Sequence, residues 1–205
     1  MMERSSGILL SVSSLPSPYG IGTLGKAAYD FADFLRDAGQ TYWQMLPLGP
    51  TSYGDSPYQS FSTFAGNPYF IDLDLLIRDG LLTENEVKNC LWGTEPRYVD
   101  YGKIYESRFT LLQKAKERGW QRDEKEVAAF VKENQRWLTD YTRFSTHRFQ
   151  LAHKIVEVFF GFTAAWPSAP LSSGTIVSKN SNKRAEYIFC AIEMSESKGS
   201  ICLNI

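Results

Sequence analysis

Two apolar runs and the periodic apolar stripe between them predict a strand, a helix and a second strand near the N-terminus. Residues 7–12 form a short apolar run that ends in serines and a proline, which predicts a strand followed by a loop. The next apolar residues recur at spacings of four and three: Leu24, Ala28, Phe31, Leu35 and Ala38. This spacing is typical of an amphipathic helix with one buried stripe, and Gly39 predicts its end. Residues 41–48 predict a second strand, apolar enough to be buried on both faces.

A strand, a helix and a strand in this order predict an α/β fold. The pattern is typical of the start of a (β/α)8 barrel, and it is equally compatible with the start of a doubly wound sheet.

Three helices are expected in the next region, with no strand between them. Thr83 with Glu86 three residues later is a capping-box pattern, which predicts a short helix. Apolar spacing from Tyr105 onward predicts a second helix that ends at Gly119, and Asp123 predicts the cap of a third. Because barrel repeats alternate strands and helices, these three helices are not standard barrel repeats.

Aromatic and polar side chains gather in residues 46–67, a long loop directly after the second predicted strand. Such loops carry the binding residues of α/β barrels. Five candidates lie within seven positions: Tyr53, Asp55, Ser56, Tyr58 and Gln59. Aromatic rings cover the apolar faces of a pyranose, while carboxylate, amide and phenol groups meet its hydroxyls. The loop therefore predicts a site for a polyhydroxylated ligand such as a sugar. The alternative is an aromatic loop that only packs the mouth of a barrel.

Many motifs with fixed spacing occur in about the first seventy residues. They are Ser6–Leu10, Ser14–Pro16, Tyr19–Gly22, Tyr42–Gln44, Leu46–Pro50, Tyr53–Ser60 and Phe64–Pro68. Weaker motifs follow at Val99–Gly102, Tyr105 and Trp137–Tyr141, and the pattern fades near Phe144. Together they resemble the amylomaltases, the bacterial 4-alpha-glucanotransferases related to the α-amylase barrels. The resemblance implies the start of a (β/α)8 TIM barrel with an inserted helical subdomain.

The resemblance also implies an enzyme that transfers α-1,4-glucan segments to glucose or to another glucan. Such an enzyme serves starch, glycogen and maltodextrin metabolism, needs no cofactor, and has α-1,4-glucans, maltodextrins and glucose as its partners. By the same resemblance, Tyr58 lies beside the glucose ring at the cleavage point. Tyr53 and Tyr105 match two tyrosines of a secondary glucan site.

Three further residues of the loop are candidates for substrate binding. Asp55 and Ser56 are expected to brace the loop through an Asx-type turn before Pro57, and they are also placed to meet sugar hydroxyls. Gln59 is compatible with a contact to a sugar hydroxyl or to a loop amide.

Retaining transfer needs a carboxylate nucleophile and a second carboxyl as acid/base, about 5 Å apart. In the amylomaltases these groups lie on later barrel strands, and no carboxylate of this chain matches them. Asp72 and Asp74 would point to opposite faces of an extended segment, so they are no substitute. We therefore expect this chain to lack catalytic residues and to be inactive by itself. The alternative is a non-catalytic maltodextrin-binding fragment or a decayed gene product.

The last part of the chain departs from this pattern. No aspartate follows Asp140, and residues 171–182 are rich in serine and asparagine, with no sustained period of a helix or a strand. We expect three segments: 1–80 with the first barrel strands and substrate loop, 81–144 as the helical insertion, and 145–205 as an aberrant tail. The barrel would be C-terminally truncated and the tail out of frame or disordered. The alternative is a genuine divergent C-terminus.

Composition and charge describe an ordinary globular protein. Of 205 residues, 22 are basic and 23 acidic, and the net charge of −1 gives no reason to expect nucleic acid or an anionic membrane as partners. Three cysteines without metal-ligand spacing predict no metal site and fit a reducing cytoplasm. The absence of a long apolar N-terminal segment also favours a cytoplasmic protein.

Overall fold

The computed structural model describes residues 4–51, 55–95, 97–148, 192–194 and 201–204. The chain divides into two units. The first comprises Met1–Ser17, Ile21–Ile71 and Ala169–Ile205, and the second comprises Pro18–Gly20 and Asp72–Ser168.

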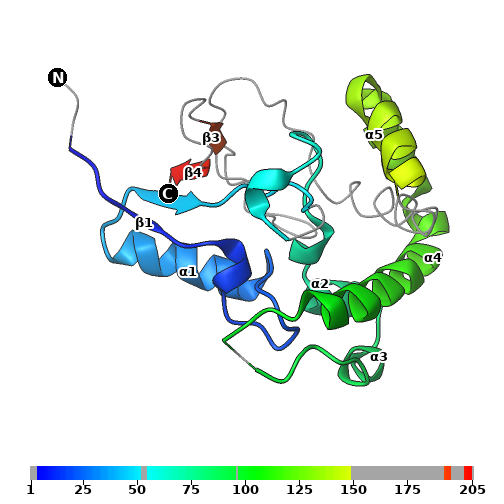
Figure 1. Ribbon diagram of the computed structural model, residues 1–205, viewed down its shortest axis with the longest axis horizontal. Helices are drawn as coiled ribbons and strands as arrows, with labels where there is room; N and C mark the ends of the chain where they lie inside the picture. The colour runs from blue at the N-terminus through cyan, green and yellow to red at the C-terminus, as the bar shows by residue number, and fades with distance from the viewer. Residues whose placement is uncertain (1–3, 52–54, 96, 149–191, 195–200, 205) are drawn as a thin grey trace. The chain divides into compact units, whose positions relative to one another are not determined.

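The first unit contains a strand–helix–strand arrangement (Figure 1). Strand β1 (Gly7–Leu9) and strand β2 (Tyr42–Met45) pair in parallel, and helix α1 (Lys26–Asp37) connects them. Helix α1 ends as predicted, because Gly39 takes a φ of 69° and its N–H donates to the carbonyl of Arg36. The α/β expectation is confirmed for this part of the chain.

Both strands are shorter than the sequence predicted. The apolar run after β1 turns at Val12–Ser14 into a 3-10 turn, η1, in which Val12 is buried. In β2, Trp43 and Met45 are buried whereas Tyr42 and Gln44 are only half-buried. The prediction that both faces of this strand are buried was therefore wrong. The apolar composition of the run reflected the aromatic ring of Tyr42, which stays partly exposed.

Two short strands from the tail complete the sheet of the first unit. Strand β4 (Ile201–Asn204) pairs antiparallel with β2, and β3 (Ile192–Met194) pairs antiparallel with β4. The strand order is β1-β2-β4-β3. The rest of the tail after residue 148 lies outside the described residues, and so does the expectation that it is out of frame or disordered.

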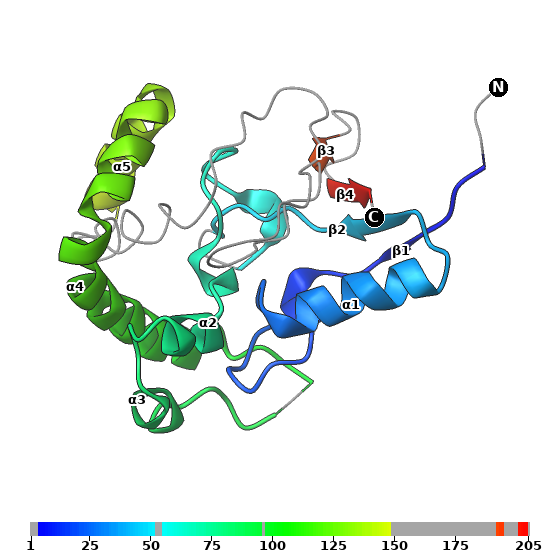
Figure 2. The same ribbon diagram turned by 180° about the vertical axis from the view of Figure 1, so that it is seen from behind.

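The secondary-structure elements described in the second unit are the helices α2 to α5, joined by turns and loops (Figure 2). Helix α2 (Leu73–Arg78) begins at Asp72, whose carboxylate accepts the Leu75 N–H at 3.0 Å. Helix α3 (Glu84–Lys88) carries the predicted capping box: Thr83 Oγ1 accepts the Glu86 N–H, and the Glu86 carboxylate accepts the Thr83 N–H.

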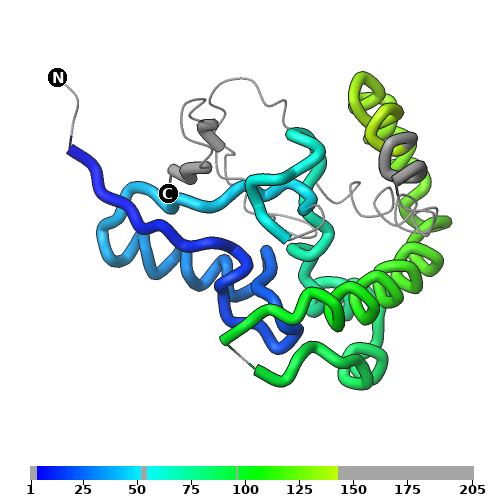
Figure 3. Tube along the Cα trace, viewed as in Figure 1, coloured from blue at the N-terminus to red at the C-terminus, as the bar shows by residue number. Residues whose placement is uncertain are grey.

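The two further helices that the sequence predicted are divided at a different point. Helix α4 (Tyr101–Glu133) runs without a break through Gly119, and helix α5 (Gln135–Arg148) follows Asn134 (Figure 3). The predictions that Gly119 ends a helix and that Asp123 caps the next were wrong. Gly119 is buried, and a Cβ there would lie 3.2 Å from Leu81 Cδ2, so this glycine serves a close packing contact.

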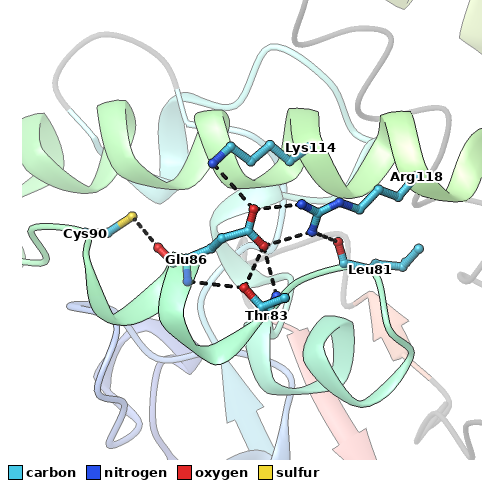
Figure 4. Close-up of polar contacts among 6 residues, drawn as sticks. All are labelled: Leu81, Thr83, Glu86, Cys90, Lys114 and Arg118. Carbon is cyan, nitrogen blue, oxygen red and sulfur yellow. Dashed lines mark hydrogen bonds and ion pairs between the residues drawn. The ribbon is translucent and has the colours of Figure 1, made fainter.

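Helices α3 and α4 are joined by a group of polar contacts around Glu86 (Figure 4). The guanidinium of Arg118 donates to both carboxylate oxygens of Glu86 at 2.8 Å, and also to the Leu81 carbonyl at 3.0 Å. Lys114 Nζ lies 3.5 Å from Glu86 Oε1. Glu86 therefore closes the capping box at the start of α3 and also attaches that helix to α4.

Candidate functional site

The candidate site is the loop that leaves β2 and returns at Asn67. The Asn67 N–H donates to the Leu48 carbonyl at 2.8 Å, which joins the two ends of the loop. The buried Asn67 side chain accepts the Tyr69 N–H at 3.0 Å and so caps η3 (Pro68–Phe70), a 3-10 turn whose residues are all buried. The base of the loop is therefore fixed by backbone pairing and by burial.

Tyr58 lies on the surface of the first unit, at the middle of the 3-10 turn η2 (Pro57–Gln59). Pro57 starts this turn with its φ already restricted, and the Gln59 N–H donates to the Ser56 carbonyl at 3.1 Å. The side chain of Tyr58 is 62% exposed, and Gln59 is exposed beside it. A flat ring held on a short ordered turn with an amide next to it can cover one face of a sugar and meet its hydroxyls.

Asp55 adopts a left-handed backbone conformation just before this turn. Its φ is 57°, and its side chain is half-buried. Burial raises the pKa of the Asp55 carboxyl above its ordinary value. The Asx-type turn expected here needs the N–H of residue 57, which a proline lacks, so that expectation was wrong.

Four of the six predicted binding residues therefore lie on one segment: Asp55, Ser56, Tyr58 and Gln59. Tyr53 lies outside the described residues. Tyr105 belongs to α4 in the other unit, where its half-buried ring packs edge-on against Phe109 with 4.9 Å between ring centroids.

Sequence reasoning missed a group of serines that shapes the returning half of the loop. Ser60 Oγ donates to the Ser62 carbonyl at 2.7 Å. Ser62 Oγ accepts the N–H groups of Phe64 and Ala65 at 3.2 and 3.0 Å. The signal was present in the sequence, because serines favour such turns through local bonds to the backbone.

Two carboxylates weighed for catalysis have structural partners instead. Asp72 caps α2, and Asp74 in its first turn accepts a hydrogen bond from the Tyr19 hydroxyl. Burial and this bond to Asp74 hold the pKa of Tyr19 above its ordinary value. Within the described ranges, no cluster of three or more histidine, cysteine, aspartate or glutamate side chains could hold a metal ion. Among the described helices, none is long and apolar enough to cross a membrane.

Comparison with known proteins decides the family. Residues 10–170 match the model of the glycoside hydrolase 77 family, described as 4-alpha-glucanotransferase. The chain belongs to the 4-alpha-glucanotransferase family. Its match to the family model continues past Phe144, where the motifs themselves fade.

Individual family members show the same likeness. The chain is 53% identical to the 4-alpha-glucanotransferase of Streptococcus pneumoniae over 139 residues, which are 67% of this chain and 28% of that protein. It is 48% identical to the enzyme of Clostridium butyricum, over 69% of this chain and 29% of that protein. The chain thus spans less than a third of the length of these relatives.

The structural comparison agrees with the family. An amylomaltase from Streptococcus agalactiae, solved in complex with acarbose, superposes with a TM-score of 0.70 at 35% identity. The match covers 80% of this chain and 39% of the amylomaltase. These matches do not favour the alternative of a non-catalytic binding fragment.

Proposed function

We propose that this chain carries part of the substrate-binding surface of a 4-alpha-glucanotransferase, with Tyr58 as its central contact. The observation that carries the proposal is the exposed Tyr58 ring on the ordered turn η2, in a chain of this family. The ring would stack on a glucose unit, and Gln59, Asp55 and Ser56 would meet the hydroxyls of the glucan. Tyr53 and Tyr105 are proposed for a secondary glucan site.

The reaction proposed for the whole protein is the transfer of an α-1,4-glucan segment to glucose or to another glucan. A retaining mechanism of this kind uses a carboxylate nucleophile and a carboxyl acid/base about 5 Å apart. A sugar hydroxyl, in place of water, then intercepts the covalent glycosyl-enzyme. No carboxylate of this chain matches those groups, so we propose that the 205-residue polypeptide does not transfer glucan by itself.

We propose that β1 and β2 are the first strands of a (β/α)8 barrel and that residues 81–144 form its inserted helical subdomain. Two observations support this proposal. Strands β1 and β2 pair in parallel and are connected by α1, and the second unit contains the long helix α4. A cytoplasmic location remains a prediction that rests on the small and odd number of cysteines.

The proposal is tested by titrating the 205-residue chain with maltoheptaose and following the heat of binding. We expect saturable binding that Tyr58→Ala weakens by about tenfold, because stacked aromatic contacts are worth roughly a kcal/mol or more. Tyr98→Ala is the matched control, since Tyr98 is 75% exposed but lies in the second unit. Equal losses in the two variants, or no binding at all, would contradict the assignment of Tyr58. Disproportionation of maltotriose by the chain would contradict its inactivity.

A further inference from the structure

The position of Tyr58 depends on a contact between the two halves of its loop. Gly49 lies on the outgoing half, one residue after Leu48, and Ser60 directly follows η2 on the returning half. An ideal Cβ on Gly49 would lie 2.3 Å from Ser60 Oγ and 3.0 Å from Ser60 Cβ. It would also lie 2.9 Å from the carbonyl oxygen of Ser62. Real Cβ atoms essentially never come this close to other heavy atoms, so a side chain at position 49 requires Ser60 and the backbone at Ser62 to shift.

Ser60 cannot easily rotate away from such a Cβ. Its hydroxyl donates to the Ser62 carbonyl at 2.7 Å and lies 3.3 Å from the Ser62 N–H. Ser62 in turn holds the amides of Phe64 and Ala65 through its own hydroxyl. Movement of Ser60 would therefore break the bonds that order the returning half of the loop. Because Ser60 is the C-cap of η2, the same movement would displace the turn that carries Tyr58.

We propose that Gly49 and Ser60 are positioning residues for glucan binding. Gly49 lets the returning half of the loop lie against the outgoing half, and Ser60 fixes the returning half in place. The pair does not touch the sugar but sets where the Tyr58 ring meets it. This inference rests on the proposed function of Tyr58.

Two opposite changes test the inference in the full 205-residue chain. Gly49→Ala adds a methyl group at the contact, whereas Ser60→Ala removes the hydroxyl without adding bulk. Gly102→Ala is the control for the first change, since its nearest neighbour, Asp100 Oδ1, is 3.6 Å from an added Cβ. Ser107→Ala is the control for the second, since Ser107 Oγ also donates to a backbone carbonyl, that of Leu91, at 2.9 Å.

The first readout needs no ligand. Amide hydrogen exchange of the loop residues Ser62, Phe64 and Ala65 should rise about fivefold or more in both loop variants, and should not change in the controls. Unchanged exchange in both loop variants would overturn the inference. If circular dichroism shows that Gly49→Ala does not fold, the Ser60→Ala variant carries the test alone.

The second readout is the affinity for maltoheptaose. Both loop variants should raise Kd by about threefold to tenfold, because a shift of about 1 Å forfeits much of a stacking contact. In a Tyr58→Ala background, Ser60→Ala should cause no further rise, since the pair acts through that ring. A further rise of the same size would overturn the role as positioning residues.

Failure of the inference differs from failure of the proposed function. If Tyr58→Ala raises Kd while Gly49→Ala and Ser60→Ala leave it unchanged, the inference fails and the function of Tyr58 stands. If Tyr58→Ala leaves Kd unchanged, the proposed function fails, and the inference fails with it.

Discussion

Arg118 and Glu86 form a two-point ion pair, in which each carboxylate oxygen accepts one guanidinium N–H at 2.8 Å. Glu86 belongs to α3 and Arg118 to α4, and the same carboxylate closes the capping box with Thr83. A single side chain thus starts one helix and attaches it to another. Bidentate pairs of this kind are the stronger class of charged hydrogen bond.

Glu86→Gln should lower the stability of the second unit. Glutamine keeps the size and can still accept the Thr83 N–H, but it loses the charge that pairs with Arg118. We expect the midpoint of thermal unfolding, followed by circular dichroism, to fall by about 2–4 °C. Glu84→Gln is the control, since Glu84 pairs with exposed Lys88 one turn later on the same helix at 2.7 Å. An equal fall in the control would show that the contact with α4 contributes nothing.

The same pair predicts a dependence of stability on pH. The Arg118 guanidinium, and then the Thr83 amide and hydroxyl, hold the pKa of Glu86 below its ordinary value of 4.5. A carboxyl with a lowered folded-state pKa stabilises the protein above the ordinary value and loses that effect as pH falls below it. The chain should therefore lose stability more steeply below about pH 4.5 than Glu86→Gln does. Denaturation midpoints measured from pH 3 to 7, about the usual range for carboxyl titration, check this. Parallel curves would contradict it.

Gly119→Val should destabilise the chain although it lies within a regular helix. Its side chain would press against Leu81 Cδ2 and Asp123 Oδ2, which lie 3.2 and 3.3 Å from an ideal Cβ. We expect a loss of about 1–3 kcal/mol in the free energy of unfolding, measured by urea denaturation. Gly102→Val in the first turn of the same helix is the control and should be close to neutral. Similar values for both variants would mean that α4 is free to move away from Leu81.

Two glycines show what could and could not be predicted from the sequence. Gly39 ends α1 as predicted, because the stop is a local property of a residue at positive φ after the last apolar position. Gly119 carries the same local signal, yet α4 continues through it. Its role depends on Leu81, which is distant in sequence. The capping box of Thr83 and Glu86 could be predicted because it is also local: its two residues lie within one helical turn.

Trp43→Phe should destabilise the first unit. Trp43 is 2% exposed, and its Nε1 donates to the Leu10 carbonyl at 2.8 Å. Its ring also packs edge-on against Phe31 of α1 with 4.9 Å between centroids. Losing the hydrogen bond and part of the buried volume should cost about 1–3 kcal/mol, measured by urea denaturation.

Trp120→Phe is the matched control for this change. Trp120 is 42% exposed on α4, where Lys116 Nζ lies 5.5 Å from the ring. Its replacement should change the free energy of unfolding by no more than about 0.5 kcal/mol. If the two variants lose equal stability, the bond from Trp43 to Leu10 is not part of what holds β1 to its neighbour.

The residues proposed for the candidate site could be named from the sequence, whereas the contacts that hold them in place could not. The motif around Tyr58 pointed to that tyrosine, and the structure adds its exposure on η2. The approach of Gly49 to Ser60 was not predictable, because it joins residues on opposite halves of the loop. Burial of Asp55 likewise depends on how the loop folds back.

The antiparallel pairing of β4 with β2 has a consequence for assembly. Strand β2 holds β1 in parallel on one edge and β4 on the other, so neither edge can accept another partner. A barrel of parallel strands needs the edge that β4 occupies for its third strand. The two arrangements compete for the same backbone N–H and carbonyl groups. If β1 and β2 are the first strands of a barrel, as proposed above, a third parallel strand must displace β4 from β2 before it can pair there.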